Sequence, residues 1–308
     1  MAPELFPRSL PVFSHLAGLP AGHSWLAGLP DRVDRLRRRW GLVLGAPLRG
    51  GTSSWVAPAR RPDGTEAVLK VTWPHPEASA EPDALRRWAG RAAVRLLDVA
   101  GDDNALLLER VRPATPLAAA EEIPPARRLE LAAEVVAELW SVPVGGGVAV
   151  PGLAAVCAGW AEVTAARAGT PGADLDAGLV RRGVELLREL PSSADRAVLL
   201  HGDLNPGNLL AARRRPWLAI DPKPVLGDPA YELWPLVEQV DDPRDRPSVL
   251  ASRFRLLADV LGLDPARVAA WALARTVEGA LWSAAHGDPA GGRSAMAVAP
   301  VLARLAGV

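Results

Sequence analysis

The change from strand-like to helix-like sequence patterns along the chain is the feature that most limits its fold. Residues 46–73 read as two strands, GTSSWVAPA and EAVLKVTW, and the turn sequence RPDGT between them is typical of a β-hairpin. Beyond residue 112 the sequence is rich in Ala and Leu and has helical periodicity over most of its length. A β-rich part followed by a helical part predicts an α+β protein of two lobes with a cleft between them.

We expect a small N-lobe over residues 1–112, with a helical extension at its N-terminus. The first thirty residues are rich in Pro and Gly, and Asp31 could cap a helix that runs to about Trp40. A second helix is expected at about 77–90. The segments AAVRLLDVAG and NALLLERV then predict a second hairpin, with its turn at Gly101 to Asn104.

Residues 113–308 predict a larger, mainly helical C-lobe. Two short β-like segments, AVLLHGD and PWLAIDP, interrupt its helical pattern. Amphipathic helices are expected at 127–140, 153–168, 177–190, 250–262 and 266–285.

Composition excludes several classes of function. The 35 basic residues balance 35 acidic ones, so neither nucleic acid nor an anionic membrane surface is expected as a partner. No apolar run approaches the roughly 20 residues of a membrane span, and the N-terminus lacks the pattern of a signal peptide. The one cysteine, Cys157, lies in an Ala- and Val-rich stretch and is expected to be a core residue. We therefore expect a cytoplasmic protein; the sequence leaves its oligomeric state open.

Rare residues indicate where the chemistry lies. The chain has only two lysines, Lys70 and Lys223, and the other residue types with A/T-rich codons are equally scarce, which indicates a GC-biased genome. Eight residues are Lys, Asn, Ile or Tyr, and five of them lie between His201 and Tyr231. Because codon bias works against these types, the window HGDLNPGNLLAARRRPWLAIDPKPVLGDPAY is the predicted site.

The residue types in this window suit phosphoryl transfer. That reaction needs a carboxylate to orient the attacking hydroxyl, hard oxygen ligands for Mg²⁺, and a cation for the nucleotide phosphates. Asp203 suits the first role, and Asn208 with Asp221 suits the second. The Asn208 carbonyl would bind the metal without adding a negative charge beside the phosphates. Lys70 suits the third role.

Lys70 lies in an otherwise apolar strand, AVLKV, so it needs either an edge position or an anionic partner. Glu81 on the following helix, or Glu77 one turn earlier, is the natural candidate. Upstream, four residues of a Gly-rich loop could offer backbone amides and hydroxyls to phosphates: Gly50, Gly51, Thr52 and Ser53.

These motifs resemble the kinase fold, and more narrowly the aminoglycoside phosphotransferase family. The D-x-x-x-x-N spacing is that of the kinase catalytic loop, with HGD in place of HRD and IDP in place of DFG. The pair HGDLNPGN and WLAIDPKPVLGDPAYELWP is most similar to the streptomycin 6-kinase and hydroxyurea phosphotransferase branch. The resemblance implies a two-lobed, protein-kinase-like fold with ATP, or else GTP, and Mg²⁺ as cofactors.

The resemblance also implies roles for single residues. Asp203 would be the catalytic base, Asn208 and Asp221 the Mg²⁺ ligands, and Lys70 a contact of the nucleotide phosphates. Adenine would bind backbone groups of Leu108-Glu109-Arg110-Val111, so that Glu109 and Val111 belong to the nucleotide site. The Gly-rich loop lacks the G-x-G-x-x-G of protein kinases, which leaves its phosphate contacts open.

The acceptor is expected to be a small molecule. Only six residues separate Asp221 from Asp228, which leaves no room for an activation loop and peptide platform. Aminoglycosides are polycationic, and their kinases line the acceptor side with carboxylates. Glu232, Asp241, Asp242 and Glu278 are available as such carboxylates, and Trp234 or Trp282 could pack against a sugar ring. Asp228 is a further acceptor candidate. Asp228 has an alternative role, in which it ties its own loop by accepting backbone amide bonds.

Two residues of the window keep more than one interpretation. His201 is expected to hydrogen-bond backbone beside the loop rather than to act as a base, since a His base would leave Asp203 without a role. Lys223, between two prolines, could reach the transferred phosphate, balance the carboxylates of Asp221 and Asp228, or have survived codon bias by chance.

The sequence thus predicts an ATP-dependent phosphotransferase that acts on a hydroxyl of a cationic aminoglycoside such as streptomycin, and a role in antibiotic resistance. Alternative acceptors are hydroxyurea, an amino sugar or another small metabolite. A nucleotide-binding pseudokinase is a further alternative. Intact Lys70, Asp203, Asn208 and Asp221 argue against it, since pseudokinases usually lose at least one such residue.

Overall fold

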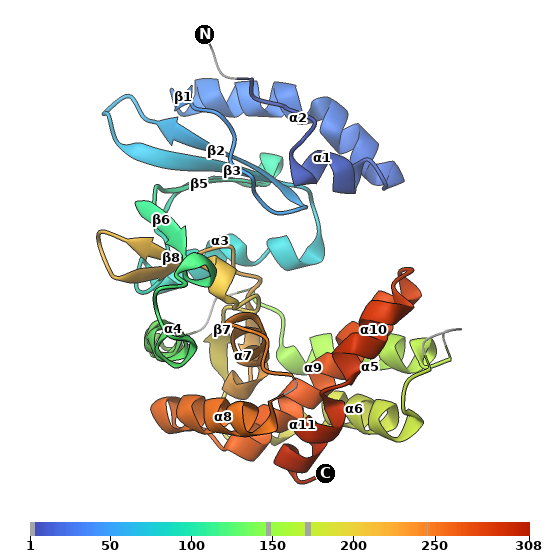
Figure 1. Ribbon diagram of the computed structural model, residues 1–308. Helices are drawn as coiled ribbons and strands as arrows, with labels where there is room; N and C mark the ends of the chain where they lie inside the picture. Colours follow the sequence, from blue (N-terminus) through green and yellow to red (C-terminus); the bar gives the residue numbers. More distant parts are fainter. Residues whose placement is uncertain (1–3, 146–148, 170–173, 245) are drawn as a thin grey trace. The chain divides into compact units, whose positions relative to one another are not determined.

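The computed structural model describes residues 4–145, 149–169, 174–244 and 246–308 (Figure 1). Its contacts divide the chain into two compact units, Met1–Arg112 and Pro113–Val308. We describe each unit by itself.

The N-terminal unit contains a five-stranded antiparallel sheet of order β1-β2-β3-β5-β4. Both predicted hairpins are confirmed: β2 pairs with β3, and β4 pairs with β5 around Asn104, whose left-handed backbone (φ 47°) closes the turn. The strands are β1 (Val43–Leu44), β2 (Ser54–Arg60), β3 (Glu66–Thr72), β4 (Leu96–Ala100) and β5 (Ala105–Glu109).

Two helices, α1 (Pro11–Leu16) and α2 (Pro20–Arg39), form the N-terminal extension. The prediction that a helix begins at Asp31 is wrong, because α2 begins at Pro20 and continues through Pro30. An internal proline costs a helix about 3 kcal/mol. Here one stripe of buried apolar side chains outweighs that cost, since each contributes about 1.5–3 kcal/mol. The stripe consists of Trp25, Leu29, Val33 and Leu36.

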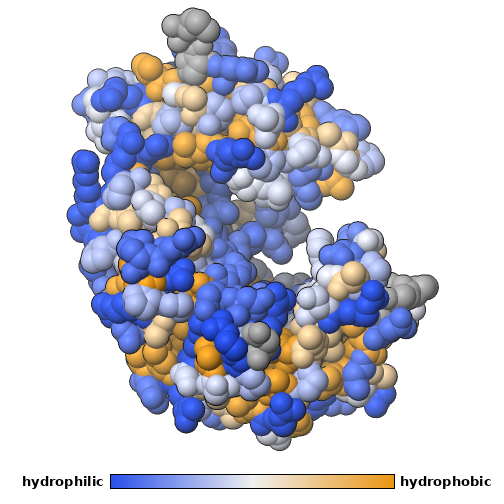
Figure 2. Space-filling model, in the orientation of Figure 1, coloured by the Kyte–Doolittle hydropathy of each residue, from blue (hydrophilic) through white to orange (hydrophobic). Residues whose placement is uncertain are grey.

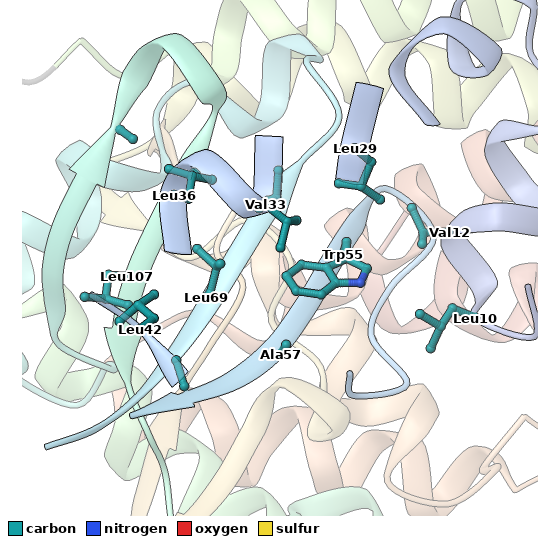
Figure 3. Close-up of a cluster of buried hydrophobic side chains, with 14 of the residues drawn as sticks. Leu10, Val12, Leu29, Val33, Leu36, Leu42, Trp55, Ala57, Leu69 and Leu107 are labelled. Carbon is teal, nitrogen blue, oxygen red and sulfur yellow. The ribbon is translucent and has the colours of Figure 1, made fainter. Parts of the chain in front are cut away.

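The stripe of α2 packs on one face of the sheet (Figure 3). Trp55 lies at the centre of this core, fully buried, and its indole N–H donates to the Leu5 carbonyl at 2.8 Å. Strand residues alternate between faces, so Leu69 and Val71 of β3 join this core while Lys70 between them points to the opposite face. Helix α3 (Glu81–Trp88) follows β3, within the range predicted for a helix, and buries Ala84, Leu85 and Trp88.

The C-terminal unit is built around α9, a helix buried on nearly all sides. The helices α5, α6, α8, α10 and α11 all pack against it (Figure 1). Such a helix must be apolar over most of its circumference, and the Ala-, Leu- and Trp-rich sequence of α9 meets that need. The helices are α4 (Pro125–Trp140), α5 (Leu153–Arg167), α6 (Ala177–Glu189), α7 (Trp234–Gln239), α8 (Pro247–Leu261), α9 (Pro265–Ala285), α10 (Pro289–Met296) and α11 (Ala299–Ala306).

Short strands carry the predicted site in this unit. One antiparallel pair joins β7 to β10, and a three-stranded sheet has the order β6-β8-β9. The predicted strands correspond to β7 and β9, whereas β6, β8 and β10 have no counterpart among the predicted strands. The strands are β6 (Pro113–Pro116), β7 (Val198–Leu200), β8 (Leu209–Ala212), β9 (Trp217–Ala219) and β10 (Val225–Gly227).

The surface is mixed in polarity. Hydrophobic residues are scattered among hydrophilic ones over the visible face of both units (Figure 2). Within the described ranges, no helix has the length and apolar character needed to cross a bilayer.

Candidate active site

Lys70 and Glu81 form a buried ion pair in the N-terminal unit. The Lys70 Nζ lies 2.7 and 2.6 Å from the two carboxylate oxygens of Glu81, and only 6% and 3% of these residues is exposed. The pair joins the middle of β3 to the first residue of α3. A buried lysine requires such a partner, and of the two candidates, Glu81 and Glu77, the structure pairs Lys70 with Glu81.

The Gly-rich loop lies beside Lys70 in this unit. It leads into β2, whose Val56 is the cross-strand neighbour of Lys70. Gly50 packs over Val56, where a Cβ would lie 3.2 Å from the valine side chain. Gly51 and Thr52 are exposed, and Gly51 has open space around its Cα. The exposed backbone of this loop therefore lies next to the part of β2 that pairs with Lys70.

The predicted adenine-binding segment lies at the end of β5. The Glu109 N–H donates to the Arg95 carbonyl at 2.9 Å, and the Glu109 carboxylate accepts the Arg95 N–H at 2.9 Å. The amide of Glu109 is thus used within the unit. Val111 lies beyond the strand and is buried, and no described group accepts its backbone N–H.

Asp203 lies on the loop that follows β7 in the C-terminal unit. Its Oδ2 accepts the Lys223 ammonium at 2.8 Å, and its Oδ1 accepts the Asn205 amide at 3.3 Å. Asn205 also accepts the Gly207 N–H and so caps the short 3-10 turn Pro206–Asn208. Both oxygens of the carboxylate are therefore hydrogen-bonded in this structure.

Three hydrogen bonds, two of them between backbone groups, join the Asp203 loop to the Asp221 segment. The Lys223 N–H donates to the His201 carbonyl at 2.8 Å, and the Ile220 N–H donates to the Asn208 carbonyl at 2.9 Å. His201 is fully buried, and its Nε2 lies 3.0 Å from the Ile220 carbonyl. Burial lowers the pKa of His201 to about 4, so the ring is neutral and donates this bond. This arrangement agrees with the structural role expected for His201.

Gly202 allows the two segments to come this close. Its φ of +79° is the left-handed conformation that favours glycine. A Cβ at this position would lie 1.8 Å from the Lys223 carbonyl oxygen. The glycine of the H-G-D motif is therefore required by the close approach of the chain beyond Asp221.

Asn208 and Asp221 offer the oxygen ligands that Mg²⁺ prefers. The Asn208 Nδ2 donates to the Asp203 carbonyl at 2.8 Å, which leaves its Oδ1 as a neutral acceptor. Asp221 follows β9 with a left-handed backbone (φ 57°), an uncommon conformation for a residue other than glycine. Mg²⁺ is usually held by one or two protein oxygens together with water and substrate phosphates, so this donor set fits the metal.

Three of the acceptor candidates are buried in the C-terminal unit. Asp228 is 2% exposed and accepts the Ala230 N–H, the Arg267 guanidinium and the Trp271 indole N–H. It thus ties its own turn to α9, as the alternative for this residue anticipates. Trp234 packs against Phe254 in the core.

Glu232 is 1% exposed and bonds inward. Its carboxylate accepts the Trp140 indole N–H at 2.6 Å and the Gly202 N–H at 3.0 Å. Burial raises the pKa of Glu232 to about 7. The Glu232 carboxylate thus supports the Asp203 loop through Gly202. The sequence did not predict this role, because Glu232 is 30 residues from Gly202 and 92 from Trp140. We do not retain Asp228, Glu232 or Trp234 as acceptor contacts.

Glu278 remains half-buried on α9. Burial raises the pKa of its carboxyl, while nearby Arg275 and Arg167 oppose the shift. The Arg275 guanidinium lies over the rings of Tyr231 and Trp160, 4.6 and 5.4 Å from their centroids. One turn beyond Glu278, Trp282 is half exposed and stacks on His286. This face of α9 therefore combines a carboxylate with an accessible aromatic surface.

Comparison with solved structures defines the class of the fold. A macrolide 2'-phosphotransferase from Brachybacterium faecium superposes with a TM-score of 0.59 over 88% of this chain and 97% of its own, at 22% identity. The fold is therefore that of the kinase-like phosphotransferases, as the sequence predicts.

Sequence comparison then defines the family. The model of the aminoglycoside/hydroxyurea antibiotic resistance kinases matches residues 39–287. A hydroxyurea phosphotransferase of Kitasatospora aureofaciens is 40% identical, covering 94% of this chain and 83% of its own. A streptomycin 6-kinase of Streptomyces glaucescens is 38% identical over 91% of each chain. The chain belongs to this kinase family.

Proposed function

We propose that this protein is an ATP-dependent small-molecule kinase that transfers the γ-phosphoryl group to a hydroxyl of streptomycin or a related aminoglycoside. The observation that carries the proposal is the clamped carboxylate of Asp203, held by Lys223 and Asn205 on a loop whose backbone is bonded to the Asp221 segment. The similarity to the streptomycin 6-kinases supports the acceptor class.

Asp203 is the proposed base. Its carboxylate would orient the acceptor hydroxyl for in-line attack and accept its proton as the new phosphorus–oxygen bond forms. A fixed direction matters here, because an attacking group positioned in advance lowers the entropic part of the barrier. Gly202 and Glu232 maintain that direction through the backbone of the loop.

We propose nucleotide contacts in the N-terminal unit and metal ligands in the C-terminal unit. Lys70, fixed by Glu81, is the proposed contact of the ATP phosphates, together with the exposed backbone of Gly51 and Thr52. Asn208 and Asp221 would hold Mg²⁺, which when bound neutralises phosphate charge. The Val111 backbone N–H is the proposed donor to adenine.

The acceptor side is assigned to Glu278, because it is the acidic candidate that remains half-buried rather than bonded into the core. A carboxylate in a partly desolvated position attracts a cationic group more strongly than an exposed one. Trp282 offers an exposed ring for packing against a sugar.

A second acceptor, hydroxyurea, follows from one specific finding, since the hydroxyurea phosphotransferase is 40% identical over nearly the whole chain. Hydroxyurea carries a hydroxyl but no fixed positive charge. It would therefore use Asp203 without needing Glu278.

A screen of acceptors tests the proposal. ADP release and the mass of the product are measured with streptomycin, other aminoglycosides, hydroxyurea and amino sugars, with Asp203→Ala as the matched control. We expect one phosphoryl group added to streptomycin by the wild type only. A flat response to every aminoglycoside with turnover of hydroxyurea would reject the leading acceptor and retain the kinase.

A further inference from the structure

Lys223 is hydrogen-bonded to the Asp203 loop through both its backbone and its side chain. Its backbone N–H donates to the His201 carbonyl, and its ammonium lies 2.8 Å from Asp203 Oδ2. Pro222 and Pro224 stiffen the backbone on either side of it. The contact with Gly202 excludes any side chain from the gap between the two segments. The position of Lys223 relative to Asp203 is thus set by the backbone.

The surroundings of this pair differ from those of an ordinary structural ion pair. About a third of each side chain is exposed, 36% for Lys223 and 31% for Asp203. Exposed pairs of this kind contribute little to stability, typically about 0–1 kcal/mol. Fold stability alone therefore gives weak reason for a lysine here, in a chain that has only one other.

The distance to Asp203 places the ammonium close to the reacting atoms. A base lies about 2.6–3.2 Å from the hydroxyl it activates, and the hydroxyl lies about 3–3.5 Å from the phosphorus it attacks. A flexible side chain that touches the same carboxylate can reach the oxygens of the phosphoryl group by rotation about its own bonds. Resting upon this proposed function, we propose that Lys223 is a catalytic residue that leaves Asp203 to bind the transferred phosphoryl group.

The chemical step balances without any change of bonding at Lys223. The bond from the acceptor oxygen to phosphorus forms as the bond from phosphorus to the β,γ-bridging oxygen breaks, and ADP leaves with that electron pair. The acceptor proton passes to Asp203. Lys223 stays protonated and neutralises negative charge on the non-bridging oxygens. Its departure from Oδ2 also leaves that oxygen available to the acceptor hydroxyl.

Single variants and chemical rescue test this role. Lys223→Met keeps most of the side-chain volume without the charge, and we expect kcat to fall about 100-fold or more while the KM for ATP stays within about threefold. Lys223→Ala should regain about tenfold in kcat with added methylamine or ethylamine, and less with bulkier amines. Arg213→Met, which removes an exposed cation on the neighbouring β8–β9 turn, is the matched control and should leave kcat unchanged.

Rescue by a free amine separates catalysis from structure, because a small amine cannot restore a tether between two loops. The proposal is rejected if Lys223→Met keeps kcat within about threefold of the wild type. It is also rejected if no amine raises the kcat of Lys223→Ala. Slow hydrolysis of ATP, in which water replaces the acceptor, is measured in parallel. It reports on Lys223 even if streptomycin proves not to be the acceptor, so the two failures are distinguishable.

Discussion

The two lysines of this chain form carboxylate pairs of nearly equal length in very different surroundings. Lys70 and Glu81 are almost fully buried, between a central strand and the start of a helix. Lys223 and Asp203 are about one-third exposed, between two loops that backbone bonds hold together. A buried pair is costly to break, whereas an exposed pair exchanges partners readily. The comparison fits the proposal that the first lysine is a fixed contact and that the second changes its partner during the reaction.

Asp203→Asn is the change with the largest expected effect on the exposed pair. The amide cannot accept the acceptor's proton, so we expect kcat to fall about 10³-fold or more, within the range for loss of a general base. The affinity for ATP should be nearly unchanged, because Lys70 and the metal ligands are intact. Steady-state kinetics and nucleotide titration measure the two quantities. A kcat within about tenfold of the wild type would remove Asp203 from the mechanism.

Lys70→Met tests the buried pair and should destabilise the fold. It leaves the Glu81 carboxylate buried without its cation, at a cost of about 3–5 kcal/mol in the free energy of unfolding. Lys223→Met is the matched comparison, and we expect a loss of under about 1 kcal/mol. Urea unfolding of both variants measures the difference.

The double variant Lys70→Met/Glu81→Leu separates the structural from the functional role of Lys70. Removing both charges should restore much of the stability, because no charge is left buried. Activity should remain lost, since nothing replaces the proposed contact with the ATP phosphates. Equal losses of stability in Lys70→Met and Lys223→Met would contradict the contrast between the pairs.

Glu232→Gln should change how stability depends on pH. Burial raises the pKa of Glu232 from 4.5 to about 7, so between these values the folded state binds the proton more tightly than the unfolded state. The wild type must therefore lose stability as pH rises through this window, and the loss is complete above about pH 7.

Between pH 5 and 8, the wild type should lose about 1–3 kcal/mol more than Glu232→Gln, which has no such proton. Unfolding free energies at both values measure this slope. The exposed Glu162→Gln on α5 serves as control and should keep the slope of the wild type. Parallel slopes for wild type and Glu232→Gln would show that Glu232 does not titrate in this range.

Glu278→Gln has the smallest expected effect, confined to the acceptor. The KM for streptomycin should rise about tenfold through the lost charge-assisted contact, with kcat little changed. Hydroxyurea, which has no fixed positive charge, should be unaffected if it is turned over. Asp259→Asn, which removes an exposed acid on α8, is the control. An unchanged KM for streptomycin would place the acceptor elsewhere on the unit.

The sequence predicted those features that residues close together in the chain determine. The RPDGT turn fixed the hairpin of β2 and β3, and an ammonium in an apolar strand demanded an acidic partner, which Glu81 supplies. The spacing from Asp203 to Asn208 likewise predicted one loop, and the structure bonds the Asn208 amide to the Asp203 carbonyl. In each case the deciding residues lie within about a dozen positions of one another.

Long-range packing decided what the sequence could not show. Nothing local indicates that Glu232 bonds to Trp140 and Gly202 rather than facing a substrate. The start of α2 was missed for a similar reason, because Pro30 reads as a helix breaker until the buried stripe across it is counted. Whether a charged residue, or a proline within a helix, is accommodated in the core depends on residues far from it in the sequence.

The most direct test of the central claim is a single-turnover reaction with ATP labelled at the γ-phosphorus. Wild-type protein in excess over labelled ATP is mixed with streptomycin, and the acceptor is separated and counted at short times. We predict that the label passes to one hydroxyl of streptomycin and that Asp203→Asn shows only background transfer. Label that appears in free phosphate instead, or transfer at equal rates in both proteins, would contradict the account.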